Sequence, residues 1–215
     1  MAEFQCLIFD MDGTLLDTEK VYRMMWPIAC AKYGYEMSDE QALAMRSFGA
    51  PYGRQKLEEF FGQDFPYTEI RTYRRKLVAD YLAEHSTELK PGCIEILTYL
   101  KEKGIGRAIC TSSNMERTAG YLKNLGLEGM FDRVISTEMV KLGKPAPDAY
   151  EYAVAQMGIP KEACLAVEDS PNGILSAHAA GLPVVMIPDQ TEPDEELSKL
   201  LYARLDCLLD LKKLV

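Results

Sequence analysis

The 215-residue chain contains only two histidines and one tryptophan, and none of its six cysteines forms a Cys-x-x-Cys pair. With neither such pairs nor histidines at zinc spacing, the sequence does not resemble a zinc site or a disulfide framework. We therefore expect reduced cysteines in the core of a cytoplasmic protein. The cysteines stand at positions 6, 30, 93, 110, 164 and 207.

Positive charge is also in short supply: 24 Lys and Arg stand against 33 Asp and Glu, a formal charge of −9. Nucleic acids and anionic membranes favour clustered Lys and Arg, so we expect neither as a partner. No signal peptide is recognised ahead of Phe4, and no apolar run approaches the roughly 20 residues that span a bilayer. The 47% hydrophobic and 27% charged residues are typical of a globular protein with a substantial core.

From residue 92 onward, short apolar runs alternate with helical patterns of about ten residues. This alternation predicts βαβ units around a parallel sheet, in an α/β core of the Rossmann-like kind. The expected strands are 4–9, 105–111, 133–136, 163–167, 183–187 and a last short one at 206–209. The expected helices are 92–103, 114–125, 147–157 and 171–180.

Residues 17–88 differ from the rest, because they carry helical patterns and no convincing strand. The patterns cover 19–33, 40–45, 54–61 and 69–85. We therefore predict a core domain made of residues 1–16 and 89–215, interrupted by an inserted helical cap domain at 17–88.

Polar and charged side chains follow several expected strands, and one further loop carries a lysine just before a helix. In an open parallel sheet, ligands bind beyond the carboxyl ends of the strands, so these side chains are candidates for a shared site. They are Asp10, Asp12, Thr111, Ser112, Lys144, Glu168 and Asp169.

Phosphoryl transfer with Mg²⁺ is the chemistry that these groups could share. Mg²⁺ prefers hard oxygen ligands, and Asp10 and Asp169 are the natural carboxylates. One carboxylate could attack phosphorus and a second, such as Asp12, could move the protons, although the residues alone leave open which aspartate attacks.

The phosphate would need donors and a cation. Thr111 and the backbone amides near Ser112 could hold its oxygens at a strand-to-helix turn, and Lys144 could neutralise its charge. Each element taken singly is also common as a turn or a helix cap. Their occurrence together at one edge of the sheet favours function.

The chain resembles the haloacid dehalogenase superfamily of phosphatases and phosphomutases along essentially its whole length, and the combination of motifs is specific. The helical insertion is similar to the four-helix cap of the subgroup that includes β-phosphoglucomutase and many small-molecule phosphatases. The matching motifs, in order, are Asp10-Met11-Asp12-Gly13-Thr14-Leu15, Thr111-Ser112-Ser113-Asn114, Gly143-Lys144-Pro145-Ala146-Pro147-Asp148 and Val167-Glu168-Asp169-Ser170-Pro171-Asn172-Gly173.

The resemblance implies a role for each motif residue. It implies Asp10 as nucleophile and Asp12 as general acid and base, which decides between the two aspartates. Mg²⁺ would be held by Asp10, the backbone carbonyl of Asp12 and Asp169, with Glu168 close by. Phosphate would be bound by Thr111, Ser112 and Lys144.

Differences between this sequence and particular members of the superfamily indicate which of the family's reactions to expect. Dehalogenases of this superfamily lack an acid at the place of Asp12, so its presence favours a C–O–P substrate. β-Phosphoglucomutase carries a cap histidine where Tyr22 stands here, whereas Glu19 is the acid that related phosphatases often show. These features predict a phosphatase acting on a small phosphomonoester, such as a sugar phosphate, with a phosphomutase as the alternative.

The cap loop at 49–53 has no arginine in register with the one through which β-phosphoglucomutase contacts sugar phosphate. Arg46 and Arg54 flank this loop instead and, with Glu19 and Tyr22, are candidates for substrate contact. A binding or regulatory protein on an inactive hydrolase scaffold is a third hypothesis, although it would be expected to have lost catalytic residues. We expect a small phosphorylated metabolite as partner, without specifying whether it is a sugar phosphate, a polyol phosphate or a nucleotide, and a monomer or small homo-oligomer.

Overall fold

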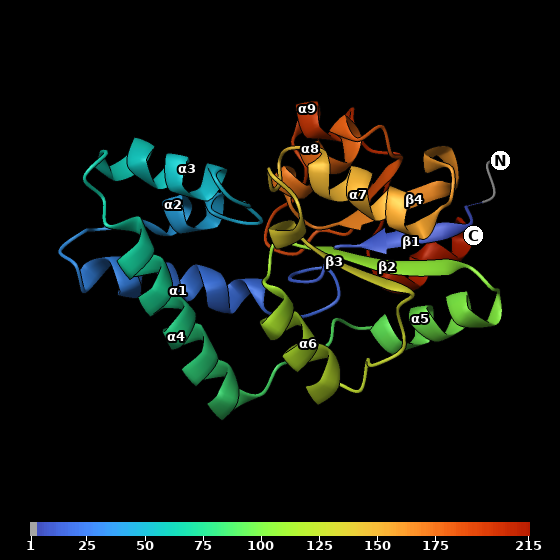
Figure 1. The fold of residues 1–215 in the computed structure, drawn as a ribbon, viewed down its shortest axis with the longest axis horizontal. Helices are drawn as coiled ribbons and strands as arrows, with labels where there is room; N and C mark the ends of the chain where they lie inside the picture. The colour runs from blue at the N-terminus through green and yellow to red at the C-terminus, as the bar shows by residue number, and fades with distance from the viewer. Residues whose placement is uncertain (1–3) are drawn as a thin grey trace.

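A six-stranded parallel sheet forms the centre of the computed structural model, which describes residues 4–215 (Figure 1). The strands follow the order β3-β2-β1-β4-β5-β6. They are β1 (Cys6–Phe9), β2 (Gly106–Thr111), β3 (Arg133–Ser136), β4 (Cys164–Glu168), β5 (Val184–Met186) and β6 (Ala203–Arg204). The predicted Rossmann-like α/β fold is confirmed.

Helices cover both faces of the sheet, and β1 shows why. Leu7 and Phe9 point into one apolar core, and Cys6 and Ile8 point into the other. All four side chains are buried, as expected for a central parallel strand. The first core includes side chains of α5 (Cys93–Glu102) and α6 (Met115–Asn124), and the second those of α7 (Asp148–Met157), α8 (Pro171–Ala179) and α9 (Glu195–Ser198).

Four further helices lie to one side of the sheet, where the helical insertion was predicted (Figure 1). They have an apolar core of their own, built around Trp26, Leu57 and Ile70. The helices are α1 (Glu19–Ala31), α2 (Asp39–Ala44), α3 (Tyr52–Phe61) and α4 (Tyr67–His85). We call residues 17–88 the cap; its standing as a separate domain remains a prediction.

The last strand was predicted at 206–209, and this placement is wrong. The strand is β6, whose Ala203 pairs with Val185 of β5. The apolar residues that suggested a strand open the 3₁₀ helix η3 (Leu208–Lys213), in which Leu208 and Leu211 are both buried. Residues three apart face the same side of a 3₁₀ helix, so this spacing places both in the core. The other 3₁₀ helices are η1 (Thr137–Met139) and η2 (Lys161–Ala163).

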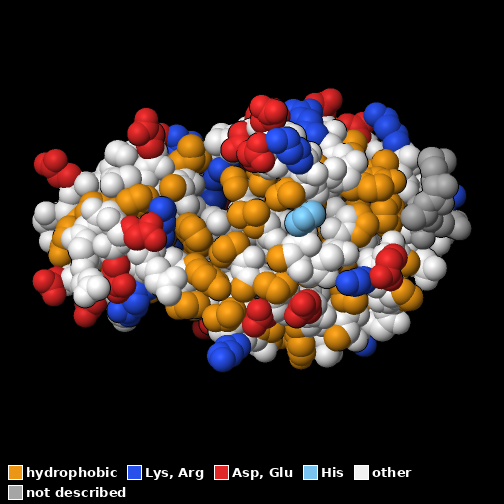
Figure 2. Space-filling model, turned by 90° about the horizontal axis from the view of Figure 1, so that it is seen from above, with side chains coloured by type: hydrophobic (Ala, Val, Ile, Leu, Met, Phe, Trp, Pro, Cys, Tyr) orange, Lys and Arg blue, Asp and Glu red, His pale blue; other side chains and the backbone are white. Residues whose placement is uncertain are grey.

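The surface carries charges of both signs. On the face seen in Figure 2, acidic and basic side chains are interspersed among apolar ones and do not form a continuous basic area. Within residues 4–215, no helix combines the length and the apolarity needed to cross a membrane.

Candidate active site

The carboxyl ends of β1, β2 and β4 lie side by side, because β1 pairs with both other strands. Asp10 follows β1, and its backbone N–H donates to the carbonyl of Val167, 2.9 Å away. Thr111 ends β2 and Glu168 ends β4. The structure therefore brings the motif residues together at one edge of the sheet, as the sequence predicted.

Lys144 is the buried cation of this edge. Its Nζ donates to Asp10 Oδ1 at 2.6 Å, to Glu168 Oε1 at 2.5 Å and to the carbonyl of Cys110 at 2.9 Å. Burial alone lowers the pKa of Lys144, but the charges of Asp10 and Glu168 outweigh it and raise the pKa above its ordinary value. Lys144 is thus held as an ammonium beside Asp10.

Three carboxylates could share a metal ion. Asp10, Glu168 and Asp169 each place an oxygen within 4.8 Å of the others. Glu168 already accepts from Lys144 and from the hydroxyl of Tyr150, at 2.7 Å. By contrast, Asp10 Oδ2 and Asp169 Oδ2 are buried without a hydrogen-bond partner among the described residues. Two buried carboxylate oxygens without a partner fit the ligand set of a hard divalent cation.

The electrostatics of these acids agree with such a site. Burial raises the pKa of Asp10 to about 8, although the charge of Lys144 opposes the shift. Burial, followed by the charges of Asp10 and Glu168, raises the pKa of Asp169 well above its ordinary value. A bound cation would relieve this repulsion and favour the ionised carboxylates.

Gly13 permits the close approach of the first motif to Asp169. Its φ is +93°, and a Cβ at this position would lie 2.5 Å from Asp169 Oδ2. Thr14 donates its hydroxyl proton to Asp169 Oδ1 at 3.1 Å. A side chain larger than hydrogen at residue 13 would therefore displace the Asp169 carboxylate.

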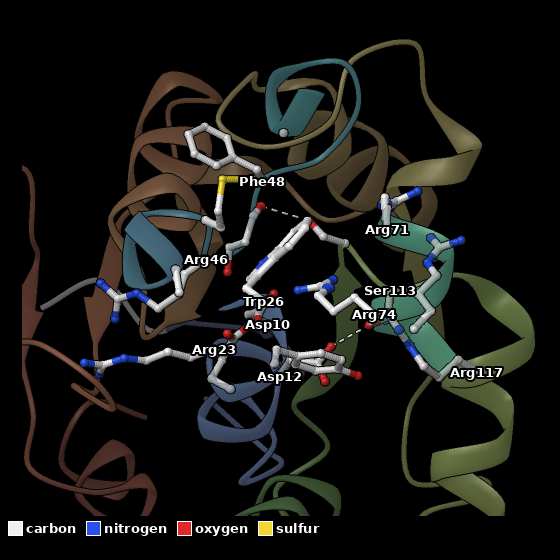
Figure 3. A pocket seen from close by; sticks show the side chains of 18 of the residues that line it. Asp10, Asp12, Arg23, Trp26, Arg46, Phe48, Arg71, Arg74, Ser113 and Arg117 are labelled. Atoms are coloured by element: carbon white, nitrogen blue, oxygen red, sulfur yellow. Dashed lines mark hydrogen bonds between the residues drawn. The ribbon is translucent and has the colours of Figure 1, made fainter. Parts of the chain in front are cut away.

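Asp12 is held by hydroxyl groups rather than by a lysine. Thr18 Oγ1 donates to Asp12 Oδ1 at 2.7 Å, and Ser113 Oγ donates to Asp12 Oδ2 at 2.5 Å. Arg117 in turn donates to Ser113 Oγ at 2.7 Å. The carboxylate is oriented at the wall of a cavity that it shares with Asp10 (Figure 3).

The cavity lies between the core and the cap, and most of the predicted substrate-contact residues line it. Glu19, Tyr22, Arg46 and Ser112 are among the lining residues. Burial, with the charges of Asp12 and Asp10, raises the pKa of Glu19 to about 8. The hydroxyl of Tyr22 lies 2.9 Å from that of Tyr121 on α6.

Five of the predicted site residues are not among those that line the cavity: Lys144, Glu168 and Asp169, which are buried beneath it, and Thr111 and Arg54. Thr111 is buried, and its Oγ1 accepts from the backbone N–H of Ser113 at 3.0 Å. Arg54 is exposed on α3, where it pairs with Glu58 at 3.8 Å and lies over the ring of Tyr67. The structure therefore does not bring Arg54 to the site.

The cap closes over the core through the loop at 46–50. Gly49 N–H donates to the carbonyl of Lys144 at 2.9 Å, and Gly143 N–H donates to the carbonyl of Ala50 at 2.8 Å. Ser112 Oγ donates to the carbonyl of Ser47 at 3.0 Å. The loop that carries Lys144 is thus hydrogen-bonded directly to the cap.

Sequence reasoning missed a group of cavity residues that the fold gathers from α1, α4 and α6. One signal could have indicated them: three of the arginines recur at helical i, i+3, i+4 spacing on α4, which places them on one face. The missed residues include Trp26, Arg71, Arg74, Arg75 and Arg117.

Comparison with known proteins agrees with this architecture. The family model for haloacid dehalogenase-like hydrolases matches residues 4–181. The chain is 31% identical over 207 residues to Protein CbbY of Rhodobacter capsulatus, covering 91% of this chain and 90% of that protein. It is 32% identical over 181 residues to fructose-1-phosphate phosphatase YqaB of Escherichia coli K12, covering 83% of this chain and 94% of that protein.

A putative β-phosphoglucomutase from Bacteroides vulgatus has a similar solved structure, with a TM-score of 0.82 at 24% identity over 99% of this chain and 87% of that one. The chain belongs to the haloacid dehalogenase-like hydrolases. The resemblance drawn from the motifs is confirmed, and with it the class of enzyme, a phosphomonoester hydrolase.

Proposed function

We propose that the protein is a Mg²⁺-dependent phosphatase that hydrolyses a small phosphomonoester through an aspartyl-phosphate intermediate. The observation that carries the proposal is that the carboxylates of Asp10 and Asp12 line the same cavity. Lys144 donates a hydrogen bond to Asp10. Relatives include a fructose-1-phosphate phosphatase, which supports a sugar phosphate or a similar compound as substrate.

In the first step, a carboxylate oxygen of Asp10 attacks phosphorus and the P–O bond to the alcohol breaks. Asp12, in its protonated form, donates its proton to the departing oxygen. Lys144, which is fully buried, stabilises the negative charge close to Asp10. The alcohol product then leaves.

In the second step, water attacks the phosphorus of the aspartyl-phosphate. Asp12, now ionised, accepts a proton from this water, and the bond between phosphorus and the Asp10 oxygen breaks. Inorganic phosphate forms, and Asp10 returns as a carboxylate. The hydroxyl groups of Thr18 and Ser113 keep Asp12 oriented for both proton transfers.

Mg²⁺ would be held by Asp10 and Asp169, with Glu168 beside them and the backbone carbonyl of Asp12 as the further ligand that the family resemblance implies. Support comes from the two orphaned carboxylate oxygens and the raised pKa values of Asp10 and Asp169. When bound, the cation would neutralise charge on the phosphoryl group.

Phosphomutase activity is the alternative within the same fold. The likeness to a putative β-phosphoglucomutase lies below 25% identity and supports the fold alone. The family's mutase uses a cap histidine at the place of Tyr22, whose hydroxyl here is engaged with Tyr121. This favours hydrolysis over return of the phosphoryl group to a sugar.

Phosphate release from p-nitrophenyl phosphate tests the proposal. We expect release with Mg²⁺ and loss of release in excess chelator. A second assay supplies β-glucose 1-phosphate, a catalytic amount of the bisphosphate and glucose-6-phosphate dehydrogenase. Rapid NADPH formation without phosphate release would replace the phosphatase by the mutase, and no turnover in either assay would favour a binding protein.

A further inference from the structure

Four arginines line the part of the cavity formed by α4 and α6. Arg71, Arg74 and Arg75 lie on α4 of the cap, and Arg117 lies on α6 of the core. The phosphatase chemistry described above assigns no substrate contact to any of them. We call these four residues the arginine wall.

Among the described residues, no carboxylate forms an ion pair with the arginine wall. Within residues 4–215, none of its four members has an Asp or Glu oxygen within 4.0 Å, although Glu19 and Asp12 line the same cavity. Other arginines of the chain are paired, for example Arg23 with Asp39 and Arg107 with Asp132. The wall is therefore a concentration of positive charge in a protein whose net charge is −9.

Arg74 has the clearest orientation. Figure 3 shows its side chain reaching from α4 into the cavity beside Trp26, whereas Arg23 and Arg46 extend to the opposite side. Its guanidinium carbon lies 4.0 Å from the centre of the Trp26 ring system, and its Nε is buried without a hydrogen-bond partner among the described residues. Stacking on an aromatic face leaves the planar donors of an arginine available for an oxyanion.

Arg117 and Arg74 both lie over the ring of Tyr22. The two guanidinium carbons lie 5.2 and 5.5 Å from the centre of the Tyr22 ring. Arg117 donates one bond to Ser113 Oγ, while its buried Nε has no partner in the described part of the chain. One arginine from the cap and one from the core thus converge on the same aromatic ring.

For Arg74 and Arg75 the neighbouring cations are unfavourable, whereas for Arg117 burial is outweighed by the neighbouring Tyr22 and Asp12, which raise the pKa. Burial lowers the pKa of Arg74 to about 10; Tyr22 and Glu19 oppose this shift, and the charges of Arg117 and Arg71 add to it. Burial and the neighbouring charges of Arg71 and Arg117 also lower the pKa of Arg75. An anion bound between them would remove the repulsion and supply the missing acceptors.

The phosphoryl group that is transferred is not this anion. Its phosphorus must reach Asp10, where Lys144 already provides a buried positive charge. We infer that the arginine wall binds a second anionic group of the substrate, a phosphate or a carboxylate, at the end remote from the phosphoryl group that is transferred. This inference rests on the proposed phosphatase function and narrows its substrate to compounds anionic at both ends.

A consequence concerns closure of the cap. An anion shared by Arg74 and Arg117 connects α4 to α6, which belong to the cap and to the core. Substrates with the second anionic group would thus stabilise the closed cavity, and those without it would not.

Matched substrates test the inference. The value of kcat/KM is measured for fructose 6-phosphate, whose far end is uncharged, for fructose 1,6-bisphosphate and for 6-phosphogluconate, and likewise for glycerol 3-phosphate against 3-phosphoglycerate. We expect kcat/KM to be at least tenfold higher for one or more of the compounds with a second anionic group than for the matched compound without it. The preferred compound identifies phosphate or carboxylate as the second group.

Variants then connect this preference to the arginine wall. The ratio compared is kcat/KM for a substrate with the second anionic group over kcat/KM for the matched substrate without it. Arg74→Gln and Arg117→Gln should each reduce this ratio by roughly 10- to 100-fold, as expected for the loss of hydrogen bonds to a charged group. Arg74→Lys should have an intermediate effect, because it keeps the charge and loses the planar fork. Lys76→Gln is the matched control, since Lys76 is an exposed residue of the same helix.

The outcomes are distinguishable. Equal or undetectable rates within every pair, while p-nitrophenyl phosphate is hydrolysed, would overturn the inference and leave the phosphatase proposal standing. An unchanged ratio in both glutamine variants would also overturn it, since a merely structural role would lower both members of a pair alike. If Arg74→Gln fails to fold, Arg117→Gln alone decides.

Discussion

At the core end of the cavity Lys144 donates to both Asp10 and Glu168, whereas at the cap end Arg74 has no carboxylate within ion-pair distance among residues 4–215. At the core end, Lys144 thus balances part of the negative charge of the carboxylates. The carboxylate oxygens there that have no hydrogen-bond partner fit a cation. The cap end has an excess of donors that fits an anion. Under the proposed function, the core end would carry out the chemistry and the cap end would select the substrate.

The largest expected effect comes from breaking the core end. Asp10→Asn should lower turnover of p-nitrophenyl phosphate by several powers of ten, because an amide can neither attack phosphorus nor serve as an anionic metal ligand. Steady-state phosphate release measures the loss, and circular dichroism checks that the fold is intact. Asp80→Asn, at an exposed ion pair on α4, is the control. Activity above about a hundredth of wild type would contradict the role of Asp10.

Closure of the cap connects the two ends, and Gly49 provides a way to weaken it. A Cβ at Gly49 would lie 2.5 Å from the Cα of Gly143, next to the hydrogen bonds that join the loop at 46–50 to the Lys144 loop. Gly49→Ala should therefore separate cap and core and lower kcat/KM by roughly tenfold or more. Gly120→Ala, in a helix with open space around the site, is the matched control. Wild-type kcat/KM in Gly49→Ala would show that this contact is dispensable.

A smaller effect should appear in the dependence of stability on pH. The pKa of Asp10 is about 8 in the folded protein against an ordinary value of 3.8, so between these values the folded state binds more protons than the unfolded state. This contribution to stability is complete below about pH 4 and is lost as pH rises towards 8, by at most about 1.4 kcal/mol per pH unit. In chelator, the wild-type Tm should therefore fall relative to that of Asp10→Asn over this range.

Thermal melts at several pH values measure this difference. We expect it to amount to several degrees, since 1 kcal/mol shifts Tm by about 2–4 °C in a protein of this size. Added Mg²⁺ should raise the wild-type Tm more at pH 8 than at pH 5, because only ionised carboxylates bind it well. A difference between the two proteins that does not change with pH would contradict the raised pKa of Asp10.

Much of the core end could be predicted because its residues stand directly after strands. Parallel strands end at the same edge of the sheet, so Asp10, Thr111 and Glu168 had to lie close together once β1, β2 and β4 were recognised. The strand predicted at 206–209 was wrong, since the burial of Leu208 and Leu211 follows the period of a 3₁₀ helix that short apolar runs do not reveal. The mechanistic roles of the core residues remain predictions.

The cap end could be predicted much less well. Arg46 and Arg54 were chosen because they flank one loop, yet Arg54 turns outward on α3 to Glu58, and Arg46 donates to Thr191. Arg74 and Arg117 are separated by 43 positions in the printed sequence, and no local pattern connects them. Only the position of α4 against α6 brings their guanidinium groups to the same ring of Tyr22.

The sequence by itself determined the parallel sheet, the helical insertion and the identity of the groups at the strand ends, because strand and helix periods and the residues that follow them are local properties of the chain. The tertiary structure alone decided which hydroxyl groups orient Asp12, which cap loop bonds to the Lys144 loop, and which arginines enter the cavity. These depend on how two packed bodies of helices and strands meet, and that geometry follows from side-chain packing between segments far apart in the chain.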